Sequence, residues 1–325
     1  RCGVRFAEAL GRAVGRGVEV RVLVDAMGAR YSWPSVLRDL RRLHVPYARF
    51  LPTLLGPGLH YSNLRNHRKI LIVDGRLGFT GGMNLREGHE LRLAPRHPIR
   101  DLHFEVTGPV VGEMQSAFAE DWAFSAREVL EGETWFPPAP PDGPTWARGI
   151  ADGPDETFGK LRNVYLGAIA CARRSLRIVT PYFLPHSAIL TSLVVAAMRG
   201  IEVEIFLPAR NNLKLVQWAS TAILWQVLEG GCRVRLTPPP FDHTKFMVVD
   251  GAWTLVGSSN WDARSLRLNF EFDVECYDPS FARAMEARLE WRRREGREVT
   301  LAEVDSRGLP IRLRDGVARL FSPYL

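Results

Sequence analysis

Short apolar stretches alternate with polar turns along most of the chain, and their periods predict both strands and helices. Residues 68–73 are rich in aliphatic and β-branched side chains, end at Asp74-Gly75, and precede a second short apolar stretch over 76–80. Asp-Gly is a strong signal for a tight turn, so this region is predicted to be a β-hairpin. Helices are predicted over 6–15, 35–43, 114–124, 161–173, 213–228 and 281–296.

The hairpin returns later in the chain with the same flanking residues. The first copy contains His67, Lys69, Asp74, Gly75, Gly81 and Asn84, and the second contains His243, Lys245, Asp250, Gly251, Gly257 and Asn260. The spacing is identical in the two copies, without a gap. A repeat of this kind indicates two similar structural units.

We therefore expect an α/β fold of two pseudo-symmetric halves, each a mixed β-sheet flanked by helices, with the active site at their junction. The expected divisions are an N-terminal half over 1–130, a linker rich in Pro and Gly over 131–160, and a C-terminal half over 161–325. Residues 16–20 match residues 199–203. The second match is preceded by a predicted helix and strand that have no counterpart in the first half, so the first half is expected to lack its opening helix and strand.

The repeated residues form a set suited to phosphate chemistry. Side chains two apart on a strand point to the same face, so His67 and Lys69 are expected to project together, as are His243 and Lys245. Asn84 and Asn260 lie just past the returning strands. A lysine neutralises a phosphate, an amide donates a hydrogen bond, and an imidazole attacks phosphorus or donates a proton.

Two facing imidazoles need different roles, one as a neutral nucleophile and one as a protonated acid. A carboxylate behind an imidazole fixes its tautomer, and Asp101 and Glu271 occupy matching places after the two motifs. Asp74 and Asp250 are counted with the catalytic set because they repeat. Their place in the Asp-Gly turn nevertheless favours a role in holding the hairpin.

At these residues the chain resembles the phospholipase D superfamily, and within it the bacterial cardiolipin synthases. Supporting stretches are Thr80-Gly81-Gly82-Met83-Asn84, Arg100-Asp101-Leu102-His103, Thr180-Pro181-Tyr182-Phe183, Val256-Gly257-Ser258-Ser259-Asn260 and the ending Phe321-Ser322-Pro323-Tyr324-Leu325. The family often has serine where Ser258 stands, whereas the first half has Gly82, where only a backbone N–H is expected to serve.

The resemblance implies a transphosphatidylation that joins two phosphatidylglycerols into cardiolipin and glycerol through a phosphohistidine. It implies His67 as nucleophile and His243 as acid, with Lys69, Lys245, Asn84, Asn260 and Ser258 around the substrate phosphate. We expect no metal and no cofactor. Alternatives are a phospholipase D hydrolase that uses water, a nucleic-acid phosphodiesterase, and a non-catalytic lipid-binding scaffold. The superfamily's nucleases are typically short chains with one motif, so nucleic acid is not the expected partner.

Composition favours an anionic partner but does not choose between acidic lipid, nucleic acid and a phosphate-bearing substrate. Basic residues exceed acidic ones by 43 − 36 = 7, which favours an anionic partner such as acidic lipid. The four cysteines show no metal or disulfide spacing and are expected to be reduced. We expect a phospholipid substrate and a membrane surface, at the cytoplasmic face of the bacterial inner membrane, and leave the acceptor and oligomeric state open. The run Arg292-Arg293-Arg294 is predicted to be a solvated face, and residues 309–325 suit either a leaflet surface or the protein's own domain.

Overall fold

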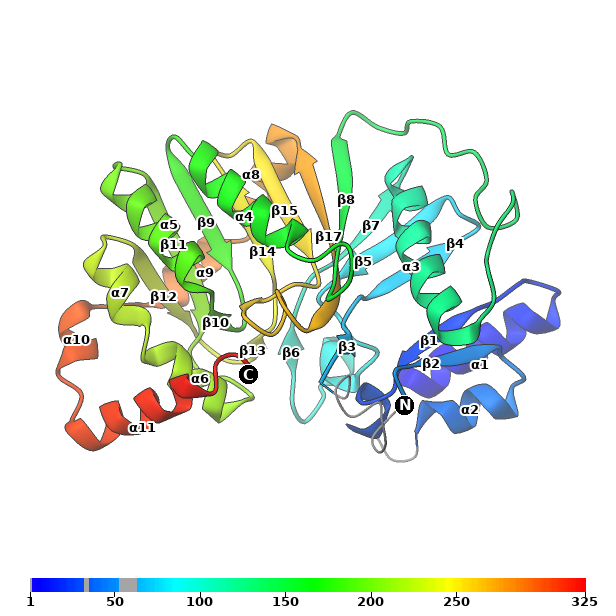
Figure 1. The fold of residues 1–325 in the computed structure, drawn as a ribbon, viewed down its shortest axis with the longest axis horizontal. Helices are drawn as coiled ribbons and strands as arrows, with labels where there is room; N and C mark the ends of the chain where they lie inside the picture. Colours follow the sequence, from blue (N-terminus) through cyan, green and yellow to red (C-terminus); the bar gives the residue numbers. More distant parts are fainter. Residues whose placement is uncertain (1, 32–34, 53–62) are drawn as a thin grey trace.

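The computed structural model describes residues 2–31, 35–52 and 63–325. Residues 53–62, which precede the first motif, lie outside the described residues. Figure 1 shows two α/β halves side by side, with β17, β8 and α3 near their junction. The predicted fold class is confirmed.

The first half contains fewer paired strands than the second. Its helices are α1 (Cys2–Gly15), α2 (Val36–Arg42) and α3 (Val110–Ala126), with short 3-10 turns η1 (Gly28–Tyr31), η3 (Glu87–His89) and η4 (Leu91–Leu93). Its strands are β1 (Val22–Asp25), β2 (Tyr47–Phe50), β3 (Arg65–Asn66), β4 (Ile70–Val73), β5 (Leu77–Gly81), β6 (Ile99–Arg100) and β7 (His103–Thr107). The described strands form a parallel pair, β1-β2, and a separate antiparallel sheet, β4-β5-β7, instead of the one mixed sheet expected.

The second half is built on one large mixed sheet. Its strands are β8 (Trp146–Asp152), β9 (Ser175–Val179), β10 (Phe183–Leu184), β11 (Glu202–Pro208), β12 (Arg233–Thr237), β13 (Phe241–Asp242), β14 (Phe246–Val249), β15 (Trp253–Gly257), β16 (Trp261–Asp262), β17 (Asn269–Tyr277) and β18 (Arg297–Val299). The order is β18-β12-β11-β9-β14-β15-β17-β3, with β8 also paired to β17. β8 falls inside the segment expected to be an irregular linker.

Helices cover both faces of this sheet. They are α4 (Lys160–Cys171), α5 (Ser187–Met198), α6 (Lys214–Thr221), α7 (Leu224–Glu229), α8 (Pro279–Ala287), α9 (Glu290–Glu295), α10 (Leu301–Asp305) and α11 (Leu309–Leu320). The helices expected over 213–228 and 281–296 are each divided in two. No helix among the described residues is both long and apolar enough to cross a bilayer.

The predicted hairpins form, and an apolar core joins the halves. Asp74 and Gly75 have φ of 52° and 60°, and Asp250 and Gly251 have 54° and 63°, the left-handed pair that a tight hairpin turn needs. Between the halves, buried residues of α3, β14, β15, β17 and α8 pack together against β4 and β7. This shared core holds the ends of both hairpins at the junction.

Candidate active site

The strand that leads into each histidine pairs with a strand of the other half. β3 runs parallel to the start of β17, and β13 runs parallel to β6. The His67 N–H donates to the Phe270 carbonyl at 2.8 Å, and the His243 N–H donates to the Arg100 carbonyl at 2.7 Å. Each histidine is therefore placed beside the residue that precedes the opposite half's carboxylate.

The two imidazoles and the two carboxylates pair crosswise. His67 Nδ1 lies 2.8 Å from Glu271 Oε2, and His243 Nδ1 lies 2.7 Å from Asp101 Oδ2. The matching places of Asp101 and Glu271 predict a carboxylate behind a histidine, but the exchange between halves was not predicted. Because Nδ1 of each ring is hydrogen-bonded to a carboxylate, Nε2 is the nitrogen that can attack phosphorus or transfer a proton.

Glu271 is held as a carboxylate by its surroundings. It is fully buried, and it accepts hydrogen bonds from Ser258 Oγ at 2.5 Å and Asn269 Nδ2 at 3.0 Å. Burial alone favours the neutral acid, but the His67 imidazole, Lys69 and Ser258 hold the pKa of Glu271 below its usual value. Ser258, which was expected beside the substrate phosphate, instead bonds to this carboxylate.

Asp101 has a different environment and needs the glycine on the neighbouring strand. It accepts the Leu102 N–H at 2.8 Å, and burial raises its pKa. A Cβ added at Gly82 would lie 2.3 Å from Asp101 Oδ1, so a serine there would collide with the carboxylate. The Gly82 N–H, expected to serve the site, donates to the Leu102 carbonyl at 3.0 Å.

Burial lowers the pKa values of both lysines and both imidazoles at the site. Lys69 Nζ donates to the His67 carbonyl at 2.7 Å, and Lys245 Nζ lies 2.9 Å from His243 Nδ1. Burial lowers the pKa of Lys69 to about 7 and that of Lys245 to about 8. Burial also lowers the pKa of His67, and it lowers the pKa of His243 further, with Lys245 adding to the effect. An anionic phosphate would restore positive charge to this cluster.

The two repeated asparagines are not equivalent in the structure. Asn260 is buried, its Nδ2 donates to Ser265 Oγ at 3.3 Å, and its Oδ1 has no hydrogen-bond partner in the described structure. Asn84 is exposed. A buried amide oxygen without a partner is uncommon and is a reason to expect a ligand group that donates a hydrogen bond there, such as a hydroxyl.

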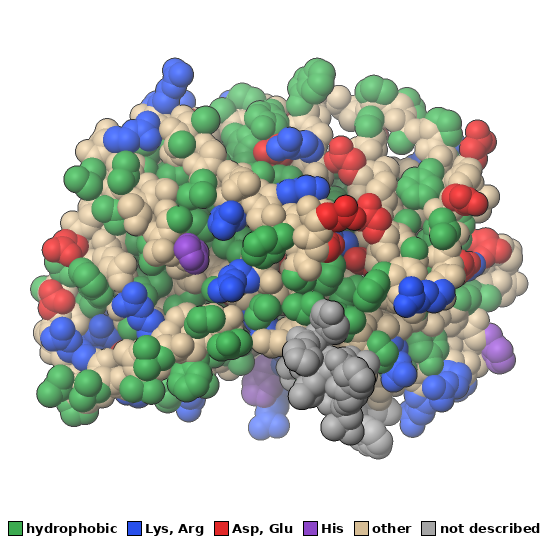
Figure 2. All heavy atoms as spheres, in the orientation of Figure 1, with side chains coloured by type: hydrophobic (Ala, Val, Ile, Leu, Met, Phe, Trp, Pro, Cys, Tyr) green, Lys and Arg blue, Asp and Glu red, His purple; other side chains and the backbone are tan. Residues whose placement is uncertain are grey.

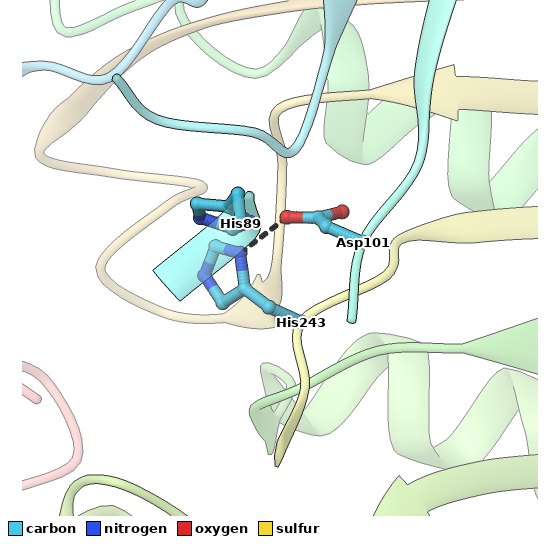
Figure 3. Close-up of side chains that lie close together, drawn as sticks. All are labelled: His89, Asp101 and His243. Atoms are coloured by element: carbon cyan, nitrogen blue, oxygen red, sulfur yellow. Dashed lines mark hydrogen bonds and ion pairs between the residues drawn. The ribbon is translucent and has the colours of Figure 1, made fainter. Parts of the chain in front are cut away.

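His89 is a site residue that the sequence analysis missed. Its ring centroid lies 6.1 Å from that of His243, and Figure 3 shows His89, Asp101 and His243 converging. His89 Nδ1 is buried and has no hydrogen-bond partner in the described structure, and burial lowers the pKa of His89 to about 4. His89 follows Asn84 by the same five residues that separate Ser265 from Asn260, so extending the repeat past the asparagine would have pointed to it.

The same trio is the candidate metal-binding group among the described residues. Donor atoms of His89, Asp101 and His243 all lie within 4.8 Å of one another. The Lys245 ammonium lies 2.9 Å and 3.1 Å from the two His243 nitrogens. A divalent cation would be repelled by this ammonium, so the trio suits proton transfer better than metal binding.

Asp74 and Asp250 lie outside the site, so a catalytic role does not fit their position. Each sits at the far end of its hairpin, seven residues after the histidine, which is about 23 Å of extended chain at roughly 3.3 Å per residue. Asp250 accepts the backbone N–H groups of Arg173, Arg174 and Ser175 at 2.8–2.9 Å. Asp74 is exposed in its turn. The structure supports the turn-holding role that the Asp-Gly pattern favoured.

Buried ion pairs hold the approach strands in place. Arg292 is 2% exposed and lies 2.8 Å from Asp242, the residue before His243. The prediction of a solvated face for the arginine run is therefore wrong at Arg292. In the first half, Asn66 precedes His67 and donates to Asp121 at 2.7 Å, and Asp121 also pairs with Arg68 at 2.8 Å.

Comparison with known proteins assigns this geometry to a family. The family model "Cardiolipin synthase, PLD-like domain" matches residues 2–122 and 165–293. Major cardiolipin synthase ClsA of Bacillus subtilis is 34% identical over 326 residues, covering 99% of this chain and 67% of that protein. Cardiolipin synthase A of Pseudomonas fluorescens is 34% identical over 323 residues, with the same coverage. A crystal structure of phosphatidylserine synthase from Haemophilus influenzae matches 94% of this chain and 83% of its own with a TM-score of 0.69 and 14% identity, which speaks to the fold alone.

Proposed function

The chain belongs to the cardiolipin synthase family of phospholipase D-like proteins, and from that premise we propose that it transfers a phosphatidyl group from one phosphatidylglycerol to another. The products are cardiolipin and glycerol. The observation that carries the proposal is the crossed pairing of His67 with Glu271 and of His243 with Asp101, which orients two imidazoles at the junction of the halves.

In the first step His67 Nε2 attacks phosphorus and the bond from phosphorus to the glycerol oxygen breaks. His243 gives its proton to that oxygen, so neutral glycerol leaves and the phosphatidyl group stays on His67. In the second step the hydroxyl oxygen of another phosphatidylglycerol attacks phosphorus, its proton passes to His243, and the P–N bond breaks. Protons and electron pairs balance over the two steps, and His67 and His243 end as they began.

The assignment of His67 as nucleophile is supported by the carboxylates. Glu271, whose pKa is lowered, places a full negative charge behind His67 and stabilises the positive phosphohistidine. Asp101, whose pKa burial raises, shares a proton more readily with His243, as an acid–base residue requires. The deeper lowering of the His243 pKa favours the reverse assignment in the empty site, because a neutral imidazole is the better nucleophile.

The remaining site residues are proposed to bind the phosphate. Lys69 and Lys245 neutralise its charge, and Asn260 and Asn84 donate hydrogen bonds to the oxygens that gain charge in the transition state. No cofactor or metal enters the mechanism. The acceptor hydroxyl of phosphatidylglycerol distinguishes the proposed synthase from a hydrolase, in which water attacks the same intermediate.

The proposal is tested with phosphatidylglycerol vesicles and mass spectrometry of the lipid products. We expect cardiolipin and free glycerol from the wild-type chain, and turnover reduced on the order of 10^4-fold or more in His67→Ala. His97→Ala, which alters an exposed histidine, is the matched control. Phosphatidic acid without cardiolipin would replace the synthase with a hydrolase, and full activity in His67→Ala would reject the mechanism.

Trapping the intermediate tests the nucleophile separately. Acid-free quenching followed by peptide mass spectrometry is expected to locate the phosphatidyl group on the peptide containing His67. A label on the peptide containing His243 would reverse the two roles.

The proposal extends to organisation and location. We assign the phospholipid-binding activity to a membrane surface, at the cytoplasmic face of the bacterial inner membrane, and not to nucleic acid. The bacterial sources of the relatives and the net charge of +7 support this assignment. We retain 1–130, 131–160 and 161–325 as the proposed divisions of the chain, with β8 as a strand within the second of them.

A further inference from the structure

Helix α11 exposes the apolar side chains that a surface helix ordinarily buries. Leu309, Leu313, Val317 and Leu320 are spaced four, four and three residues apart, so they form one stripe along the helix. Their exposed fractions run from 56% at Val317 to 76% at Leu320. A contiguous apolar stripe in water marks an interaction site.

The opposite face of α11 attaches the helix to the protein through charged groups. Asp315 on that face is 1% exposed and pairs with Arg307 at 2.6 Å and with Arg314 at 2.7 Å. The Arg314 guanidinium also lies 4.4 Å from the Trp218 ring of α6. These contacts fix the rotation of α11 about its axis, so the stripe faces the solvent.

Basic residues border the stripe. At about 100° of rotation per residue, Arg312 and Arg319 lie on one flank of the stripe and Arg314 on the other. On the neighbouring helix, Leu213 and Leu215 are each 49% exposed, and Lys214 between them is exposed as well. Figure 2 shows hydrophobic and basic side chains mixed at the lower left, where Figure 1 places α11. Apolar residues bordered by arginines match the boundary between acyl chains and anionic headgroups.

The stripe continues toward the candidate active site. Tyr324, which follows α11, is 67% exposed, and its carbonyl accepts a hydrogen bond from Arg264 at 3.0 Å. Ser265, which follows Arg264 in the chain, is the hydrogen-bond partner of Asn260 in the site. In Figure 1 the C-terminus lies beside β10 and β13, the strand that leads to His243.

A second apolar element borders the site from the first half. Leu85, Leu91 and Leu93 are 57%, 46% and 62% exposed on the loop that carries His89. Arg86 and Arg92 are exposed on the same loop. The site thus has apolar and basic elements beside it from both halves.

We propose that the stripe on α11, with the adjoining Tyr324, is the surface on which this protein lies on an anionic lipid bilayer, so that a phosphodiester reaches the paired histidines from the interface. This inference rests on the proposed function, because it assumes a substrate that resides in a bilayer. A second copy of the chain is the competing occupant of the stripe. The arginines on both flanks favour lipid, because two identical basic borders would repel each other across a symmetric contact.

Vesicle flotation with the whole 325-residue chain tests the surface. The double variant Leu313→Glu/Leu320→Glu is expected to bind vesicles of phosphatidylglycerol and phosphatidylcholine at least tenfold more weakly than the wild type. Met198→Glu is the matched control, since Met198 is 77% exposed on α5, and it should bind as the wild type does. Arg312→Gln/Arg319→Gln is expected to bind anionic vesicles severalfold more weakly and to lose part of the salt dependence.

A soluble substrate separates this inference from the proposed function. On monomeric short-chain phosphatidylglycerol the Leu313→Glu/Leu320→Glu variant should react within twofold of the wild type, and this also verifies that it folds. Undiminished vesicle binding by this variant would overturn the inference. If light scattering also shows that the wild type is a dimer and the variant a monomer, the stripe contacts a second copy of the chain instead of lipid. Loss of vesicle binding in the variant, with no cardiolipin formed by the wild type, would uphold the surface and reject the proposed function.

Discussion

In the candidate active site, burial changes the pKa values of the two lysines more than their immediate partners do. Lys69 and Lys245 lie beside carboxylates that favour their charged forms, yet burial brings their pKa values to about 7 and about 8. A lysine is cationic below its pKa. The charge that binds phosphate is therefore lost as pH rises through this range.

The pH dependence of turnover follows from these lysines. We expect kcat/KM to fall as pH rises above about 7–8, because it reports the free enzyme. The corresponding fall in kcat should occur at higher pH, since the bound anion raises both lysine pKa values. Initial rates on phosphatidylglycerol vesicles from pH 6 to 10 measure both.

Arginine at position 69 provides the check. The arginine in Lys69→Arg stays charged throughout this range, so kcat/KM should begin to fall at a higher pH than in the wild type, even if the rate itself is lower. If kcat/KM falls at the same pH in Lys69→Arg and in Lys245→Arg as in the wild type, the lysines do not cause the fall.

His89 gives a second prediction at this scale. Its unpartnered Nδ1 and its proximity to His243 lead us to expect that it hydrogen-bonds substrate or acceptor. Losing one such bond costs about 1 kcal/mol, so His89→Leu should lower kcat/KM by roughly fivefold. His97→Leu, exposed on the same loop, is the control. An effect below twofold in His89→Leu would mean that the ring only fills space.

At the scale of elements, the sequence predicted most where the repeat is local. The Asp-Gly turns, the hairpins and the pairing of His with Lys depend on residues close in sequence, and they form as predicted. The crossed contacts of His67 with Glu271 and of His243 with Asp101 join residues 204 and 142 positions apart. Strand partners at that separation depend on the packing of the shared core, which no local pattern reports. Arg292 was misjudged for the same reason, because Asp242, which neutralises it, lies 50 positions earlier.

In the first half, β4 is an edge strand, whereas its counterpart in the second half, β14, lies inside the sheet. β14 pairs with β9 and β15 and is buried throughout, whereas β4, its counterpart, pairs with β5 and is partly exposed. No strand among the described residues lies between β1 and β4, where β9 lies between β11 and β14. Asp250 binds the chain entering β9, and Asp74 is exposed at the matching place.

Hydrogen exchange should report this difference. We expect the amides of β4 that point away from β5 to exchange at least tenfold faster than their equivalents in β14, because edge strands open by local fluctuation. β5 and β15, each paired on both sides, serve as internal references and should differ less. Equal protection of β4 and β14 in the isolated chain would show that the edge is covered.

At the scale of the whole molecule, the halves are expected to unfold together. The core between them contains Met114 of α3 and Phe272 of β17, which are buried to 0% and 1% exposure, and the approach strands cross the junction in both directions. Separating the halves would expose this core and both histidine–carboxylate pairs. We therefore expect one calorimetric transition, with calorimetric and van't Hoff enthalpies in agreement. Two resolved transitions would indicate that the junction is weaker than its packing implies.

The crossed pairing also has a consequence for synthesis on the ribosome. His67 is translated before Glu271, which orients it and lies 204 residues later. At about 5–20 residues per second, His67 waits roughly 10–40 s for its carboxylate. During that interval the nascent chain carries an imidazole without its orienting partner, so the growing polypeptide stays chemically silent toward lipid at least until Glu271 has been made.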